Sequence, residues 1–188
     1  MGPELKTLFD LGDALILRTF RKDDAEKVYQ TVDRNRRHLQ TYMHWITPDY
    51  SRASATEFIT KSIESAKAGG SLSFGIFRGE ILIGSIGFVH FDWKARKTEI
   101  GYWIDKTEEG KGIVSAACKL LIEYAFGDLG LNRIEIRCSS ENIRSAAIPV
   151  GFGFEMEGVL RQAEIRNGKL HDFTIYGLLA ADWRNREL

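Results

Sequence analysis

The sequence predicts an α/β protein with a mixed, mainly antiparallel sheet of about seven strands and helices on both faces. Short apolar runs separated by tight turns occur from Ser71 onward, which predicts antiparallel hairpins. A strand, helix, strand pattern between Glu99 and Cys138 predicts one parallel pair, because such a unit crosses over right-handedly. Finally, Asn167-Gly168 lies between two strand patterns, and Asn-Gly is the strongest short signal for a hairpin.

The first third of the chain has mainly helical patterns. Its expected elements are, in order, a strand over residues 14–20, helices over 21–32 and 35–43, a loop over 45–51 and a helix over 53–68. Asp23 and Asp24 lie in the first turn of a predicted helix, where the helix dipole favours acids. Gly69-Gly70 end the last of these helices.

Strands dominate the rest of the chain. The expected elements are strands over residues 72–77, 81–88 and 97–104, a helix from Gly112 to near Gly130, a strand over 133–138, a helix over 142–150 and strands over 159–165 and 170–179. In the longer helix, apolar residues recur at helical spacing, at Ile113, Ala117, Leu120, Leu121 and Tyr124. Pro149 should truncate or kink the shorter helix, because proline lacks a backbone N–H.

The composition indicates a single domain over residues 1–188. With 188 residues, of which 44% are apolar, the chain is long enough for one sizeable core. Its 26 basic and 26 acidic residues cancel, so we expect no direct nucleic-acid partner. No signal peptide or membrane span is recognised in the sequence. Cys118 and Cys138 lie inside a predicted helix and a predicted strand, which favours buried free thiols over a disulfide. Together these features predict a soluble cytoplasmic protein.

A glycine pair marks the junction between the strand at Glu99 to Ile104 and the helix that follows. Gly110-Lys111-Gly112 lets backbone N–H groups approach a ligand, and the helix N-terminus adds its positive end, so the loop suits an anion. The alternative interpretation is that these glycines only form a tight turn and bind no ligand. Two other phosphate motifs fail, because a dinucleotide fingerprint needs glycine at Ser115 and a P-loop needs Ser or Thr at Gly112.

Residues 109–114 resemble the pyrophosphate loop of the GNAT superfamily of N-acetyltransferases, written Gln/Arg-x-x-Gly-x-Gly/Ala. More narrowly, residues 98–104, 142–145, 158–164 and 167–169 resemble the RimJ/RimL group, the ribosomal-protein N-terminal acetyltransferases. The resemblance extends from about Leu15 to Leu179. It implies the GNAT fold, with its parallel strands splayed apart, and acetyl-CoA as co-substrate. Glu109 and Val114 depart from the loop pattern, since an acid and a branched residue replace Gln/Arg and Gly/Ala.

The resemblance also implies which residues bind acetyl-CoA. Backbone near Trp103 and Ile104 would take the pantetheine arm and polarise the thioester carbonyl. Asn142, also a favoured helix N-cap, would contact the CoA arm, and Ser145 would hold or protonate the leaving sulfur. The pyrophosphate is expected on the backbone amides of Gly110, Lys111, Gly112, Ile113 and Val114, with the Lys111 side chain helping.

Two carboxylates are candidates for the general base. Acetyl transfer to an amine needs a neutral amine, a stabilised carbonyl oxygen and a proton for the thiolate. Glu99 matches the base of many GNAT enzymes, and Glu164 matches that proposed for ribosomal-protein serine acetyltransferases. Each also has a purely structural interpretation, Glu99 as a strand-end ion-pair partner and Glu164 as a solvated edge residue. An α-amine titrates about 2.5 units below a lysine, so a weak base suits a protein N-terminus.

Tyr42 and Trp45 lie in an aromatic loop that we expect to roof the acceptor site, although they could equally close the core. The four histidines, His38, His44, His90 and His171, show no metal-ligand spacing, so no metal is expected. Cys118 and Cys138 have no histidine nearby in sequence for a covalent route.

The resemblance implies acetyl transfer from acetyl-CoA to the N-terminal α-amine of a protein such as a ribosomal protein, by direct attack in a ternary complex. A small-molecule amine, such as a polyamine or an aminoglycoside, is the alternative acceptor. A non-catalytic acyl-CoA sensor is a further alternative, which Glu109 and Val114 keep open. Members of the group often pair, so a homodimer through the terminal hairpin is also an expectation.

Overall fold

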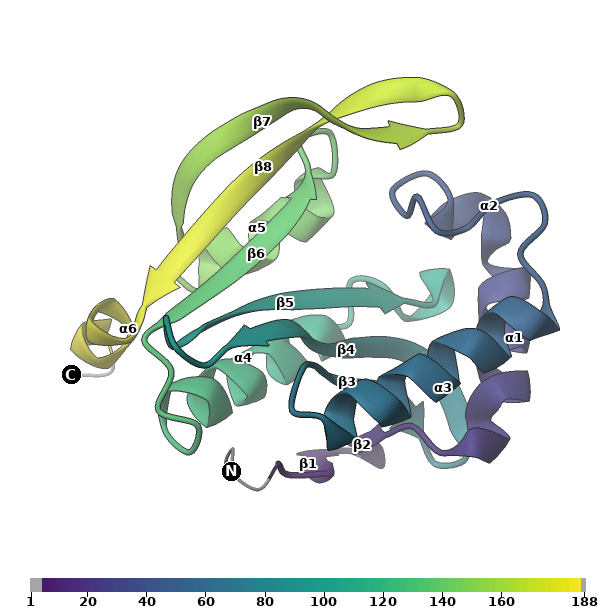
Figure 1. Cartoon of the computed structure of the whole chain (residues 1–188), viewed down its shortest axis with the longest axis horizontal. Helices are drawn as coiled ribbons and strands as arrows, with labels where there is room; N and C mark the ends of the chain where they lie inside the picture. Colours follow the sequence, from purple (N-terminus) through teal and green to yellow (C-terminus); the bar gives the residue numbers. More distant parts are fainter. Residues whose placement is uncertain (1–4, 187–188) are drawn as a thin grey trace.

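The computed structural model describes residues 5–186 and forms one eight-stranded sheet with helices on both faces (Figure 1). The strands are β1 (Leu8–Gly12), β2 (Leu15–Thr19), β3 (Leu72–Arg78), β4 (Ile81–Asp92), β5 (Lys97–Ile104), β6 (Arg133–Ser139), β7 (Glu155–Arg166) and β8 (Lys169–Leu179). The helices are α1 (Ala25–Arg34), α2 (Arg36–Leu39), α3 (Arg52–Lys67), α4 (Ile113–Phe126), α5 (Ile143–Gly151) and α6 (Ala180–Arg186), with 3-10 turns η1 (Lys22–Asp24) and η2 (Lys106–Glu108).

The strand order β1-β2-β3-β4-β5-β6-β8-β7 confirms the predicted mixed, mainly antiparallel sheet. Within it, β5 and β6 form the parallel pair, and the other neighbours are antiparallel. The predicted hairpin turn is present between β7 and β8. Asn167 and Gly168 both have positive φ, 49° and 73°, as a type I′ turn requires.

Two elements were not predicted, β1 and α6. Strand β1 lies at the edge of the sheet; Phe9 and Leu11 pack on the core but are only half-buried, and the apolar Leu8 on the other face is exposed, which interrupts the alternation that marks a strand in sequence. It reaches β2 through Asp13 and Ala14, both at positive φ. Helix α6 follows β8 directly and buries Ala180 and Trp183. The helix expected over residues 35–43 is shorter in the structure: only α2 is helical, and turns follow it.

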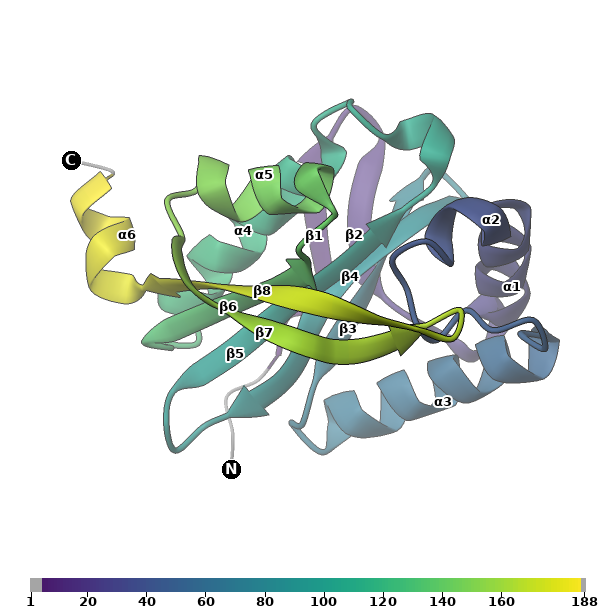
Figure 2. The ribbon, with the colours of Figure 1, turned by 90° about the horizontal axis from the view of Figure 1, so that it is seen from above.

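Apolar side chains form a separate core on each face of the sheet. On one face, α4 places Leu121 and Ile122 against the sheet, and both are fully buried. On the other face, α1 and α3 contribute Val28 and Ile59 to a second cluster, which also contains Trp103 of β5. Figure 2 shows α4 and α5 on one side of the strands and α1 and α3 on the other.

Both cysteines are free thiols buried in the first core, as predicted; Cys118 lies on α4 and Cys138 on β6. Burial raises the pKa of both thiols, which disfavours their reactive thiolate forms. No helix within residues 5–186 is long and apolar enough to cross a membrane.

The parallel strands separate after a short paired segment. They are in register only from Lys97 opposite Arg133 to Glu99 opposite Glu135. Beyond Glu99, β5 stays with β4 as far as Ile104, while β6 stays with β8 to its end. A bulge in β4, between Phe88 and Phe91, lies opposite the point of separation, and bulges increase local twist. The splayed pair that the resemblance implied is therefore present.

Candidate active site

A cavity of about 800 Å³ opens where β5 and β6 separate. Its walls come from α2 and the loop after it, the end of β5, the first turn of α4 and the start of α5. The lining residues are His38, Leu39, Tyr42, Met43, Tyr102, Trp103, Ile104, Glu108, Glu109, Gly110, Gly112, Ile113, Val114, Ser115, Glu141, Asn142, Ile143, Arg144, Ser145, Ala147 and Ile148.

The glycine loop presents unpaired amides to this cavity. Gly110 and Gly112 have φ of 72° and 75°, the left-handed region that glycine adopts without strain, and Gly112 is the N-cap of α4. The first helical hydrogen bond joins the Ala116 N–H to the Gly112 carbonyl at 2.9 Å. The N–H groups of Ile113 to Ser115 precede it and have no helical partner, so they are available to an anion at the positive end of α4.

Lys111 does not line the cavity, although its partner Glu108 does. Its ammonium lies 3.2 Å from Glu108 Oε2, an oxygen that also accepts a hydrogen bond from Arg78 at 2.9 Å. The Lys111 side chain is about half exposed. The backbone of the loop, rather than this ammonium, therefore faces the cavity.

Glu109, the acid in the Gln/Arg position, has close partners on both of its oxygens. Oε1 lies 2.7 Å from His38 Nε2, and Oε2 forms a close ion pair with Arg144. These contacts join α2, the glycine loop and α5 across the cavity. Because the Arg144 guanidinium offsets the carboxylate charge, Glu109 repels a bound pyrophosphate less strongly than an unpaired acid at this position would.

The end of β5 supplies unpaired backbone and the aromatic wall of the cavity. From Ile100 to Ile104, the β6-facing groups of the strand have no strand partner, because the parallel pairing stops at Glu99. Trp103 is buried and Ile104 half-buried, and both line the cavity. Backbone groups that are aimed at a cavity and free of strand partners can bind an extended ligand arm.

Asn142 and Ser145 are coupled at the start of α5. The Asn142 side chain accepts a hydrogen bond from the Ser145 N–H at 3.1 Å, so it caps the helix as its residue type predicts. Both residues also line the cavity, which places the Ser145 hydroxyl beside the opened end of β5.

Tyr102 holds Ser145 through two hydrogen bonds. Its hydroxyl donates to the Ser145 carbonyl at 3.0 Å and accepts from the Ser145 hydroxyl at 3.2 Å. The carbonyl is free because its helical partner would be the N–H of residue 149, and Pro149 has none. Helix α5 continues through this proline and ends at Gly151, so the predicted truncation at Pro149 is wrong; the Tyr102 hydroxyl instead satisfies the carbonyl that the proline leaves free. Burial raises the pKa of Tyr102, so the phenol remains protonated while it holds Ser145.

Glu164 lies on the opposite side of the site, on β7. Its Oε1 is 2.7 Å from His44 Nδ1, and its Oε2 is 2.7 Å from Arg166 Nε. The carboxylate is only 12% exposed. Arg166 also donates to the Thr41 carbonyl, so these contacts fasten the tip of the β7–β8 hairpin to the loop after α2. Figure 1 shows the hairpin tip reaching this loop.

Glu99, the other carboxylate, lies at the closed end of the parallel pair. Its Oε2 is 3.4 Å from Arg137 Nε, and Arg137 is also bonded to Glu135 at 2.7 Å. Burial raises the pKa of Glu99, and Arg137 opposes the shift. Glu99 is four positions before Trp103 on β5, about 13 Å along the strand, and it does not line the cavity.

The aromatic loop residues combine packing with contact to the site. Tyr42 lines the cavity, and the Arg166 guanidinium lies 5.8 Å from its ring centre. Trp45 is 37% exposed and packs against Trp103 and Tyr50, with ring centres 6.4 and 5.9 Å away. Trp45 therefore supports the wall of the cavity without lining it.

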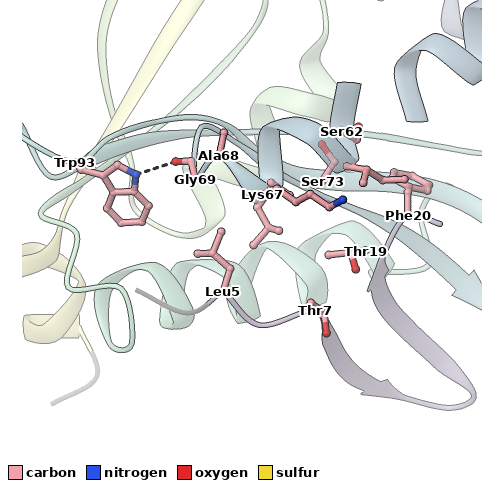
Figure 3. A pocket seen from close by; sticks show the side chains of 13 residues that line it. Leu5, Thr7, Thr19, Phe20, Ser62, Lys67, Ala68, Gly69, Ser73 and Trp93 are labelled. Atoms are coloured by element: carbon pink, nitrogen blue, oxygen red, sulfur yellow. Dashed lines mark hydrogen bonds between the residues drawn. The ribbon is translucent and has the colours of Figure 1, made fainter. Parts of the chain in front are cut away.

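A second cavity of about 630 Å³ lies between the N-terminal segment, the end of α3 and β3 (Figure 3). Apolar side chains such as Leu5 and Phe20 line it, together with Trp93, whose indole N–H donates to the Gly69 carbonyl at 2.8 Å. None of the candidate site residues predicted from the sequence lines it. Within residues 5–186, no group of three or more His, Cys, Asp or Glu side chains is arranged to hold a metal ion.

The structure thus brings most of the expected site residues to one cavity. Those that line it are Tyr42, Trp103, Ile104, Gly110, Gly112, Ile113, Val114, Asn142 and Ser145. Lys111, Trp45, Glu99 and Glu164 lie outside the lining. Three lining residues, His38, Tyr102 and Arg144, were not predicted from sequence as site residues. Tyr102 and Arg144 lie within the motifs at residues 98–104 and 142–145, whereas no local pattern marks His38.

The match to known proteins covers most of the chain. Residues 14–155 match the family model described as an acetyltransferase (GNAT) domain. The ribosomal-protein-serine acetyltransferase of Escherichia coli (strain K12) is 29% identical over 88% of this chain and 93% of that protein.

Two similar solved structures contain a CoA ligand. The microcin C7 self immunity acetyltransferase MccE, in complex with acetyl-CoA and AMP, superposes with a TM-score of 0.84 at 30% identity, over 90% of this chain and 94% of that one. RimL, the ribosomal L7/L12 alpha-N-protein acetyltransferase in complex with coenzyme A, superposes with a TM-score of 0.88 at 25% identity, over 94% and 99%.

Proposed function

This chain belongs to the GNAT acetyltransferase family and uses acetyl-CoA as its acetyl donor, and we propose that its acceptor is the N-terminal α-amine of a protein. A ribosomal protein is the acceptor class that the names of its relatives indicate. The supporting observation is the cavity itself, which joins the amides of the glycine loop, the opened end of β5 and the Ser145 hydroxyl.

The residues on the donor side fit acetyl-CoA. A Cβ placed on Gly110 or Gly112 would meet no atom within 4 Å, so there is space beside the loop amides for a pyrophosphate. The unpaired N–H groups of Ile113 to Ser115 would hold its oxygens. The pantetheine arm would lie along the opened edge of β5, where a backbone N–H can stabilise the negative charge that develops on the thioester oxygen. We assign Asn142 to the arm and Ser145 to the departing sulfur.

The open face of the sheet supports a polypeptide acceptor. Helix α3 packs beside β3, and the Trp103 end of β5 joins the cluster under α1 and α3, whereas Glu99 and Arg137 on the same face of β5 and β6 keep exposed surface. The floor there carries Glu99, Glu135 and Arg137, and the β7–β8 hairpin borders it. An uncovered, charged floor suits the end of an extended chain better than an enclosed small molecule.

A thiol-release assay with acetyl-CoA tests the acceptor class. Peptides that carry the N-termini of ribosomal proteins should release CoA thiol, and mass spectrometry should place the acetyl group on the α-amine. The same peptides with a blocked α-amine and a free lysine serve as controls and should not react. Turnover only with polyamines or aminoglycosides would contradict the proposal. Binding of acetyl-CoA without turnover on any amine would instead identify a sensor.

Ser145→Ala should lower kcat about 100-fold, because a positioned proton donor contributes roughly 10²–10⁴-fold to rate. Tyr102→Phe should lower kcat about 10-fold, since it removes the hydroxyl that orients Ser145. Steady-state kinetics on the preferred acceptor would measure both effects.

Tyr124→Phe is the matched control for Tyr102→Phe. The Tyr124 hydroxyl bonds the Lys6 N–H at 2.8 Å, outside the residues that line the cavity. The Tyr124→Phe variant should keep its kcat within twofold of the wild-type value. Equal kinetic losses in the two tyrosine variants would show that the Tyr102 effect is only structural.

A further inference from the structure

We propose that the imidazole of His44 accepts the proton of the acceptor amine, and that Glu164 and Arg166 position this imidazole. The inference rests on the proposed function, because it names the group that prepares the amine for attack. It assigns the acceptor proton to a residue that the family resemblance did not indicate.

The contact between His44 and Glu164 defines the state of the ring. A carboxylate only accepts hydrogen bonds, so the 2.7 Å contact requires His44 Nδ1 to carry a proton and donate it to Oε1. In the neutral ring, Nε2 then holds a lone pair that can accept a proton. Within residues 5–186 no hydrogen bond engages Nε2, and the His44 side chain is 63% exposed, so an amine from solution can reach it.

Glu164 is poorly placed to take the proton itself. One oxygen accepts from His44, and the other lies 2.7 Å from Arg166 Nε. The Arg166 side chain is 2% exposed, and Nη2 also donates to Ser139 Oγ at 2.8 Å. Both carboxylate oxygens are thus already engaged, one by the imidazole and the other by a buried guanidinium. Glu164 is therefore suited to orient the imidazole, as carboxylates do in other histidine-dependent sites.

The neighbours of His44 place it beside the cavity. Met43 lines the cavity, and Trp45 packs against Trp103, which also lines it. The residues on either side of His44 in sequence therefore both contact the cavity or its wall. The Arg166 contact to the Thr41 carbonyl fixes the same segment to β7.

The reaction balances with His44 in this role. The ammonium group of the acceptor gives one proton to His44 Nε2, which releases it to solvent. The neutral amine then attacks the thioester carbon, the C–N bond forms and the C–S bond breaks. The second proton lost from nitrogen reaches the departing thiolate through the Ser145 hydroxyl, which donates one proton to sulfur and accepts one from nitrogen. The products are the acetylated amine, CoA thiol and one proton in solution.

His44→Asn is the decisive variant, because the asparagine amide can still donate to Glu164 but has no basic nitrogen. It should lower kcat about 10- to 100-fold, in the range expected for general acid–base catalysis, while Kd for acetyl-CoA stays within twofold. His90→Asn, at an exposed histidine of β4, is the matched control and should keep wild-type kcat. His44→Ala should regain activity when free imidazole is added, because the exposed position leaves room for it.

The outcomes separate this inference from the proposed function. Glu164→Gln combined with His44→Asn should cost no more than His44→Asn alone, since the two residues act as a unit. If His44→Asn keeps wild-type kcat while Glu164→Gln loses it, Glu164 is the base and the His44 assignment is wrong, although the acceptor proposal stands. A wild-type protein that acetylates no amine would overturn both.

Discussion

Replacement of Arg166 by alanine should lower the free energy of unfolding by about 3 kcal/mol. The guanidinium is 2% exposed and contacts Glu164, Ser139 and the Thr41 carbonyl, so its removal leaves a half-buried carboxylate without its cation. For a chain of this length, that loss corresponds to a fall in Tm of roughly 6–12 °C. Chemical denaturation and differential scanning calorimetry would measure this loss. Activity should fall as well, because the β7–β8 hairpin is released from the loop after α2.

Arg161→Ala is the control on the same strand. Its side chain is exposed, and its loss should change the free energy of unfolding by less than about 0.5 kcal/mol. Arg166→Lys should recover only part of the stability, since an ammonium cannot reproduce the guanidinium contacts. An alanine variant as stable as wild type would show that the buried pair does not hold the hairpin.

Replacement of Gly112 by valine should raise Kd for acetyl-CoA about 10- to 100-fold. A branched residue at φ 75° costs about 1–2 kcal/mol, and relaxation of that strain would turn the loop amides away from the anion. Each hydrogen bond to a charged group contributes about 1.5–3 kcal/mol, so loss of a single one accounts for a change of this size. Isothermal titration calorimetry with acetyl-CoA would measure the affinity.

Gly130→Val is the matched control for Gly112→Val. Gly130 has φ of 60°, and a Cβ on it would meet no atom within 4 Å, so the backbone strain is comparable. It lies after the other end of α4 and outside the cavity lining. This variant should lose stability but keep the wild-type Kd; an equal loss of affinity in both variants would attribute the effect to α4 stability rather than to the loop.

The order of elements could be predicted from sequence because the signals for it are local. Apolar periodicity, Asn167-Gly168 and the glycines at 110 and 112 each act over a few residues. The glycine loop and the start of α5 could be located for the same reason, since Gly110 to Val114 and Asn142 to Ser145 are contiguous motifs. Strand β1 escaped prediction because it is a short edge strand whose exposed Leu8 interrupts the alternation of apolar and polar residues.

The acceptor side was decided by the tertiary structure. His44 and Glu164 are 120 residues apart in sequence, and Tyr102 and Ser145 are 43 apart. The separation of β5 and β6, the reach of the hairpin and the loop after α2 bring these side chains within hydrogen-bond distance. Such contacts depend on strand register and on the direction of long elements, which no short sequence pattern specifies. The sequence by itself therefore determined the elements and the glycine loop, whereas packing between distant segments decided the partners of Ser145, Glu109 and Glu164.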